Sequence, residues 1–279
     1  MTKTDTEEYF DLSYSREPAS YYYLVLCLSK NEAQAVWYHS TKNLITGFAS
    51  YPFTGSIKAL FDDYKFLSSD FKEVLVSYNA SNYLLSPRSM AFGDQTEAFQ
   101  LTNELNDEFD TLKRFQLVNT KTDISYTIPQ SIDNEVHQLI HHHQIFPLVA
   151  AHIEHELNVV KKAQQKQFLF AHISEEQIDI RVYLEGKLHM ANSFFQSGKE
   201  DIAYFILFAA EVLGVDVENS RLIASGNIEI GDKTWNLLTK YWKQIEYKDP
   251  LNGVEISPSL TDYPKATFDH LTQALLCAS

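Results

Sequence analysis

Alternation of hydrophobic and polar positions near the start of the chain predicts three β-strands joined by short turns. Residues 21–29 are rich in tyrosine and aliphatic side chains, residues 33–39 alternate, and residues 44–53 follow a short polar turn. Apolar residues with helical spacing predict a helix over 56–67, and the apolar run 73–78 predicts a buried strand. The predicted order is strand, strand, strand, helix, strand.

The next stretch, residues 80–129, is less regular. Helical spacing within 93–109 predicts one or two short helices. Strand patterns follow at 112–119 and 124–128. This stretch therefore separates the first group of elements from the helices that follow it.

Two helices are predicted before the second half of the chain. The first spans 131–140, where Ser131 or Asp133 is expected to cap the amino-terminal end. The second spans about 146–165 and ends in a group of lysines, whose charge stabilises a helix carboxyl terminus. We interpret this longer helix as a bridge between two halves.

The second half repeats the order of the first. Its predicted strands span 167–173, 177–184, 188–195 and 221–225, and its predicted helices span 198–214 and 230–244. The second and third of these strands meet at the tight turn Glu185-Gly186-Lys187. The first helix is apolar throughout 202–210, so we expect it to be buried on most sides. The offset of roughly 146 residues indicates a duplicated unit rather than a solenoid repeat.

The ends of the chain complete the predicted organisation. Residues 1–20 are interpreted as a loosely held acidic leader, and residues 249–264 as an exposed loop. A closing helix over 264–276 has enough apolar surface to dock back on the first domain. The predicted domains are accordingly 21–165 and 166–279.

The net charge excludes several classes of partner. Lys and Arg number 23 and Asp and Glu number 37, which gives a net charge of −14. Nucleic acids and anionic membrane surfaces would be repelled, so neither is expected as a main partner. The two cysteines, Cys27 and Cys277, cannot form a disulfide framework.

No segment is predicted to cross a membrane or to direct secretion. The longest wholly apolar run, 202–210, is far shorter than the about 20 residues that a membrane helix needs. The first 18 residues contain several acids and no apolar core, unlike a secretory signal. A cytoplasmic location is therefore expected.

Several short segments of the second half carry a closer resemblance to a known family. They are Gly186-Lys187-Leu188, Asn192-Ser193-Phe194, Glu200-Asp201, Tyr204-Phe205 and Ser225-Gly226-Asn227-Ile228. With the duplicated order of elements, they make the chain similar, over about residues 12–244, to a bacterial family of unknown function with an actin-like ATPase fold. Pilus and type II secretion assembly proteins are more distant analogues. The resemblance implies an α/β fold in which two ribonuclease-H-like domains face a central cleft.

The resemblance also implies a nucleotide site, which this sequence preserves only in part. Active members hold the ATP phosphates at an Asp-x-Gly turn in each half, where Gly lets the backbone approach and Asp organises Mg²⁺. The corresponding turns here, Leu28-Ser29-Lys30-Asn31 and Ile173-Ser174-Glu175-Glu176, contain neither residue. A glycine-rich turn over adenosine is represented by Ser225-Gly226-Asn227. The candidate nucleotide-binding residues are Ser29, Asn31, Ser174, Ser225, Gly226 and Asn227.

The loss of the phosphate-binding turns favours a non-catalytic adaptor or protein-interaction scaffold. Phosphoryl transfer depends on electrostatic positioning that these turns lack, so no catalytic residue and no cofactor are assigned. The expected partner is an unidentified protein, and the sequence leaves a homo-oligomer open. The alternative is a divergent ATP-binding protein or weak phosphotransferase that uses Mg²⁺ through water.

The distribution of histidines raises a third hypothesis, a metal-dependent enzyme. Six of the ten histidines lie between His137 and His155. His137 and His141 are one helical turn apart, a spacing that can bind Zn²⁺. However, the chain contains no His-Glu-x-x-His motif, Gly-x-Ser-x-Gly elbow or Walker loop. No metal site is therefore predicted.

Overall fold

Two mixed β-sheets, one in each of two units, organise the fold. The computed structural model describes residues 7–10, 18–80, 82–102, 109–174, 177–248, 250–251 and 253–278. Unit 1 comprises Met1–His152, Leu251–Lys265 and His270–Ser279, and unit 2 comprises Ile153–Pro250 and Ala266–Asp269. The domain limits predicted from the sequence stay a prediction.

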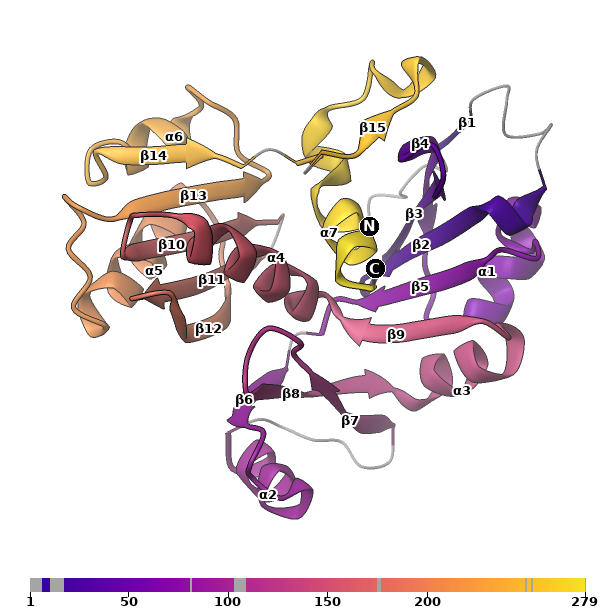
Figure 1. The fold of residues 1–279 in the computed structure, drawn as a ribbon, viewed down its shortest axis with the longest axis horizontal. Helices are drawn as coiled ribbons and strands as arrows, with labels where there is room; N and C mark the ends of the chain where they lie inside the picture. The colour runs from indigo at the N-terminus through magenta and orange to yellow at the C-terminus, as the bar shows by residue number, and fades with distance from the viewer. Residues whose placement is uncertain are drawn as a thin grey trace. The chain divides into compact units, whose positions relative to one another are not determined.

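The larger sheet of unit 1 runs in the order β1-β4-β3-β2-β5-β9, and β15 also pairs with β4 (Figure 1). Its strands are β1 (Glu7–Phe10), β2 (Tyr22–Leu28), β3 (Glu32–His39), β4 (Leu44–Pro52), β5 (Glu73–Tyr78), β9 (His143–Pro147) and β15 (Glu255–Ile256). Strands β2, β3 and β4 are antiparallel, while β5 and β9 run parallel to β2. Helices α1 (Ile57–Asp63) and α3 (Gln130–Leu139) contact each other, and each buries two aliphatic residues.

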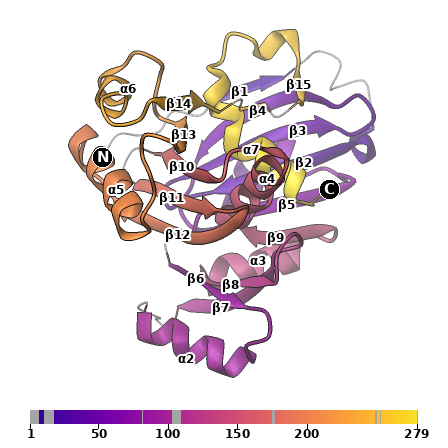
Figure 2. The same cartoon turned by 60° about the vertical axis from the view of Figure 1, so that its left-hand side comes forward.

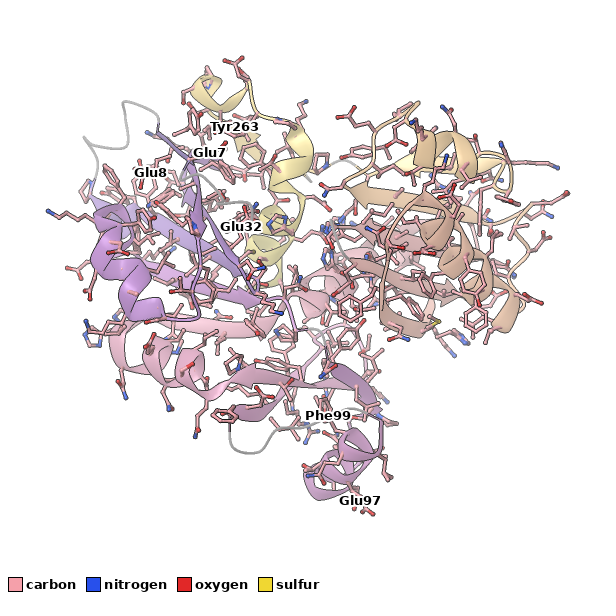
Figure 3. The ribbon with its side chains drawn as sticks, turned by 180° about the vertical axis from the view of Figure 1, so that it is seen from behind. Glu7, Glu8, Glu32, Glu97, Phe99 and Tyr263 are labelled. Atoms are coloured by element: carbon pink, nitrogen blue, oxygen red, sulfur yellow. The ribbon has the colours of Figure 1, made fainter. Side chains whose placement is uncertain are left out.

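A second, three-stranded sheet of unit 1 is inserted between β5 and α3. It has the order β6-β8-β7 and consists of β6 (Tyr83–Pro87), β7 (Asp110–Gln116) and β8 (Thr122–Pro129). Helix α2 (Phe92–Thr102) contacts β6 and β8, with Phe99 buried and Glu97 exposed (Figures 2 and 3). Within the sheet, Arg88 and Arg114 both pair with the buried Asp123, whose charge they neutralise.

Unit 2 is built on a five-stranded sheet in the order β12-β11-β10-β13-β14. Its elements are β10 (Gln167–Ile173), β11 (Gln177–Leu184), β12 (Lys187–Phe195), α5 (Lys199–Val212), β13 (Arg221–Gly226), α6 (Lys233–Leu238) and β14 (Gln244–Tyr247). One face of the sheet packs with α5 and α6 in a core that includes Ile180, Leu222, Ile206 and Trp235. The repeated strand order of unit 1 and unit 2 confirms the predicted mixed α/β class.

Two of the remaining helices contain points at which the chain passes from one unit to the other. Helix α4 (Leu148–Lys162) begins in unit 1 and continues in unit 2, and α7 (Asp269–Ala278) begins in unit 2 and continues in unit 1. Short 3₁₀ helices occur at Ala19–Tyr21, Lys65–Leu67, Pro258–Leu260 and Lys265–Phe268. No helix of the described residues has both the length and the apolar character needed to cross a membrane.

Several predicted boundaries are wrong, and the reasons are local. The helix predicted over 146–165 starts only at Leu148 because Phe146 precedes Pro147, and a residue before proline favours extended backbone. Helix α3 has Pro129 as its N-cap residue and no side-chain cap, so neither Ser131 nor Asp133 serves there.

Two other predicted segments are divided differently by the structure. The helix predicted over 56–67 is interrupted at Tyr64, which has extended dihedral angles. The helix predicted over 230–244 shrinks to α6, and Gln244 starts strand β14, which pairs in parallel with β13. The pairing of β14 with β13 depends on tertiary structure, so the spacing of apolar residues along the chain cannot predict it.

The two segments interpreted as exposed are partly ordered by strand pairing. Glu7–Phe10 of the predicted leader forms β1, which pairs antiparallel with β4, and Glu255–Ile256 of the predicted loop forms β15. Tyr263 donates a hydrogen bond to Glu7 (3.2 Å), and both side chains lie at the same edge of unit 1 (Figure 3). The rest of the leader, residues 1–6 and 11–17, lies outside the described residues.

Helix α5 is less buried than its composition predicts. Ile202, Ile206 and Ala210 face the core, as expected for an amphipathic helix. Tyr204 and Val212, however, are 60% and 62% exposed. The prediction of burial on most sides is therefore wrong, because unit 2 places its sheet against only one face of this helix.

Candidate functional site

The two hairpin turns at which a nucleotide would be held have the same closed geometry. In unit 1, the main-chain N–H and the hydroxyl of Ser29 both donate to the carbonyl oxygen of Glu32, at 2.8 and 3.0 Å. In unit 2, Ser174 makes the same two bonds to Gln177, again at 2.8 and 3.0 Å. The donors at the start of each turn are therefore used inside the turn.

Beside each turn, one carboxylate accepts hydrogen bonds from a side-chain amide and from a serine hydroxyl. The carboxylate comes before the amide in the sequence of unit 1 and after it in the sequence of unit 2. In unit 1, Glu32 accepts hydrogen bonds from the Gln34 amide (3.0 Å) and the Ser50 hydroxyl (2.6 Å). In unit 2, Asp179 accepts them from the Gln177 amide (2.6 Å) and the Ser193 hydroxyl (2.5 Å). Ser50 and Ser193 occupy matching places on the neighbouring strand, opposite Gln34 and Asp179.

The predicted adenosine turn has a structural requirement for its glycine. Gly226 has φ +81°, and a Cβ atom added there would lie 2.1 Å from the carbonyl oxygen of Ile173. That same oxygen accepts a hydrogen bond from the Asn227 N–H at 2.6 Å. The close approach of β13 to β10 explains this glycine without a ligand.

The structure gathers four of the six candidate nucleotide-binding residues in unit 2. Ser174 follows the end of β10, and Ser225, Gly226 and Asn227 lie at the end of the neighbouring parallel strand β13. Ser29 and Asn31 lie at the β2–β3 turn of unit 1. Glu175 and Glu176 lie outside the described residues. The assignment of all six to a nucleotide stays a prediction.

Next to these residues, unit 2 contains a group of charged and polar side chains that the sequence did not reveal, all buried except the half-buried His172. We name it the unit-2 polar cluster, and it consists of Glu156, His172, Arg181, Tyr183, Ser225, Lys248 and Asp269. His172, Arg181 and Tyr183 alternate along β10 and β11 with residues of the hydrophobic core, so they belong to the opposite face of the sheet.

Each buried cation of this cluster is paired with a buried carboxylate. Arg181 Nε lies 2.9 Å from both carboxylate oxygens of Glu156, which also accepts a hydrogen bond from Tyr183 (2.9 Å). Lys248 Nζ lies 3.2 Å from Asp269 Oδ1. Since both cations are neutralised within the unit, neither is available as a free charge for a phosphate group.

Burial is the largest cause of the pKa shifts of three cluster residues, Glu156, Lys248 and Tyr183. It raises the pKa of Glu156, and the nearby charges of Arg181 and Lys248 oppose that rise. It lowers the pKa of Lys248, which Asp269 opposes. It also raises the pKa of Tyr183 well above its ordinary value, with Glu156 adding to the effect. These are the shifts of a dehydrated ion-pair network.

Ser225, His172 and Asp269 lie side by side but do not form a proton relay. Ser225 Oγ is 3.0 Å from His172 Nδ1, and Asp269 Oδ2 is 3.6 Å from the same nitrogen. A relay needs the serine and the carboxylate at opposite nitrogens of the ring, because the base must accept a proton on one side while it is oriented from the other. The arrangement therefore lacks the geometry that activates a serine nucleophile.

The histidines between His137 and His155 are dispersed by the fold. His137 Nδ1 lies 2.8 Å from the Asp133 carbonyl, and His152 Nδ1 lies 2.7 Å from the Gln273 amide oxygen. His141 and His142 line an open surface cavity of about 360 Å³. Among the described residues, no group of three His, Cys, Asp or Glu side chains could hold a metal ion. The metal hypothesis gains no support from this part of the chain.

The sequence contained one weak signal for the unit-2 polar cluster. Asp179, Arg181 and Tyr183 alternate with aliphatic residues, a pattern that normally indicates a strand with one solvated face. Here Arg181 is instead buried and paired with Glu156, and the buried Asp269 pairs with Lys248. Such long-range pairing cannot be predicted from local spacing.

The duplicated sheets define an α/β protein with the actin-like ATPase fold. A crystal structure of a protein of unknown function with this fold, from Bacteroides thetaiotaomicron, aligns with a TM-score of 0.76 and 18% identity over 94% of this chain and 99% of the other. A protein chain of the PilM–PilN type IV pilus biogenesis complex aligns with a TM-score of 0.64 and 14% identity over 94% of this chain and 100% of the other.

The particular family follows from the sequence. The chain belongs to the family described as protein of unknown function DUF3822, whose model matches residues 3–245. No curated protein sequence matches the chain significantly. The expected resemblance to a family of unknown function with an actin-like ATPase fold is thus confirmed.

Proposed function

We propose that the protein is a non-catalytic adaptor, an actin-like scaffold that binds a protein partner and does not turn over ATP. The observation that supports this proposal most directly is the closure of both hairpin turns by Ser29 and Ser174. Phosphate-binding turns direct main-chain N–H groups at the ligand. Here the first N–H of each turn donates to a carbonyl of its own turn.

The charges of unit 2 support the same proposal. A bound triphosphate requires cations that can face it, as in phosphoryl-transfer sites. Arg181 and Lys248 are instead held by Glu156 and Asp269 within the buried cluster. Asp179 adds a further carboxylate near the β10–β11 turn. A nucleotide bound through Arg181 or Lys248 would therefore have to displace an existing ion pair.

The fold of the second solved structure offers a precedent for a partner. That structure is a complex between PilM and PilN. We propose a protein partner for this chain as well, and a second copy of the chain is the alternative. We also propose a cytoplasmic location, because Cys27 is buried and forms no disulfide, as is usual in reducing compartments.

Phosphate release from ATP and Mg²⁺ tests the loss of catalysis. We expect the native protein to match the buffer rate, and the variants Ser29→Ala and Ser174→Ala to match it too. A Mg²⁺-dependent release that is abolished by Ser174→Ala would show a working site at the β10–β11 turn. That result would favour the alternative, a divergent ATP-binding protein or weak phosphotransferase.

A further inference from the structure

The outer face of helix α5 carries an apolar stripe that unit 2 does not cover. Tyr204, Phe208 and Val212 follow one another at intervals of four residues and therefore share one side of the helix. They are 60%, 44% and 62% exposed. Exposed apolar residues are usually scattered singly, so a continuous stripe of three marks a surface that binds something.

The aromatic side chains of this stripe are organised before any partner arrives. The rings of Tyr204 and Phe208 are stacked, with centroids 5.9 Å apart. Phe205, on the flank of the helix, stacks on Phe194 of β12 at 4.6 Å and meets Tyr204 edge-on at 5.3 Å. A packed base of this kind fixes the rotamers of the stripe, which reduces the entropy lost on binding.

Acidic residues border the stripe. Glu200 lies four residues before Tyr204 and Glu211 lies three residues after Phe208, so both are on the side of the helix that carries the stripe. Both are exposed. Helix α5 itself carries the acids Glu200, Asp201 and Glu211 against one cation, Lys199, which lies 3.6 Å from Glu200. The border is therefore net negative and favours a positively charged occupant.

We propose that this surface, the outer face of α5 formed by Tyr204, Phe208 and Val212 with its acidic border, docks an amphipathic helix whose apolar stripe is flanked by lysines or arginines. The inference rests on the proposed adaptor function and names the chemistry of its partner. Two helices can interlock apolar ridges while the flanking charges pair across the interface. A second copy of this chain is disfavoured as occupant, because both copies would bring the same acidic border and a net charge of −14.

The test uses a synthetic helical peptide of about 20 residues, long enough to form a helix, in which leucines make one face and lysines flank it. Two matched peptides replace the lysines by glutamates or scramble the order of the same residues. Binding to the full chain is measured by fluorescence anisotropy. We expect saturable binding of the lysine peptide, weakening with salt, and little binding of either control peptide.

Variants of the protein locate the binding surface. Tyr204→Glu and Val212→Glu each place a charge in the apolar stripe and are expected to weaken binding about tenfold or more. Leu101→Glu, at an 81% exposed apolar residue of α2, is the matched control and should leave binding unchanged. Glu211→Lys keeps the stripe and reverses part of its border, so it should weaken binding and reduce the salt dependence.

Three outcomes would overturn the proposal. The first is that the Tyr204→Glu variant binds the lysine peptide as tightly as the native protein does. The second is that the glutamate peptide binds the native protein as tightly as the lysine peptide does. The third is self-association of the protein that Val212→Glu abolishes, which would identify a second copy as the occupant. Circular dichroism confirms that each variant is folded. None of these readouts depends on ATP, so the docking surface and the absence of turnover can fail separately.

Discussion

At the residue scale, Gly226 shows how a residue predicted for ligand binding can be required by the fold. Its positive φ and the 2.1 Å approach to the Ile173 carbonyl oxygen leave no room for a side chain. Gly186 has a similar φ of +76° but open space around the position of a Cβ atom. Comparing substitutions at these two glycines therefore separates the energetic cost of a steric clash from the cost of backbone strain.

We expect Gly226→Ala to lower the free energy of unfolding by at least about 3 kcal/mol, because strain and a backbone clash add. Gly186→Ala should cost only about 1 kcal/mol, from strain alone. Urea denaturation of both variants measures the difference. Equal costs would mean that β13 does not approach β10 as closely as the structure shows.

A second prediction at this scale concerns the two thiols. Burial raises the pKa of Cys27 from its ordinary 9.0 to about 12, with a hydrogen bond to Ser77 opposing the rise, while Cys277 is partly exposed. The reactive species is the thiolate, so iodoacetamide at pH 8 should label Cys277 in the native protein and Cys27 only after unfolding. Mass spectrometry of the labelled chain and of Cys277→Ser checks this. Native-state labelling of Cys277→Ser would contradict the burial.

The same shift gives a pH dependence of stability. The folded state holds the Cys27 proton more tightly than the unfolded chain does, since its pKa is raised. The contribution of this group is therefore complete below pH 9 and is lost as the pH rises toward 12. Cys27→Ala should reduce the decline of stability over that interval, although it removes packing as well.

At the element scale, strands that show an apolar pattern in their own sequence could be predicted. Strands that exist only because they pair with another strand could not. Strands β2, β10 and β11 fall within one residue of their predicted limits, because their apolar runs are bounded by turn residues. Strands β9 and β14 were missed, since each exists by pairing with another strand. The exposed stripe of α5 was likewise invisible, because periodicity cannot tell which side of an apolar helix lacks a neighbour.

Helix caps give a prediction at this scale. Asp232 Oδ1 accepts a hydrogen bond from the Trp235 N–H (2.6 Å) at the start of α6, whereas Ser131 does not cap α3. We expect Asp232→Ala to cost about 1 kcal/mol in the free energy of unfolding and Asp232→Asn to cost less. Ser131→Ala should change stability by no more than about 0.5 kcal/mol. Thermal denaturation compares them, and a larger cost for Ser131→Ala would restore the cap that the sequence predicted.

At the scale of the whole molecule, the sequence was informative about the scaffold and much less so about the site. The duplicated order of elements and the segments around Gly186 and Ser225 identified the actin-like ATPase fold, and the family and structural matches confirm it. The sequence did not show that Glu32 and Gln34 of unit 1 correspond to Gln177 and Asp179 of unit 2, because the carboxylate and the amide stand in opposite order. The correspondence becomes visible only when the hydrogen bonds of these side chains are known. The unit-2 polar cluster depends on residues more than 100 positions apart, such as Glu156 and Asp269.

The central claim is that this scaffold has lost its nucleotide chemistry, with Ser29 and Ser174 closing the two turns. Thermal unfolding with millimolar ATP and Mg²⁺ tests it most directly, with Mg²⁺ alone and ATP alone as controls. A ligand at 100 times its dissociation constant stabilises the native state by about 2.7 kcal/mol, which is readily measured. We predict no change in the melting temperature beyond that of the controls. A Mg²⁺-dependent rise would contradict the account and make the protein a nucleotide-binding member of its fold.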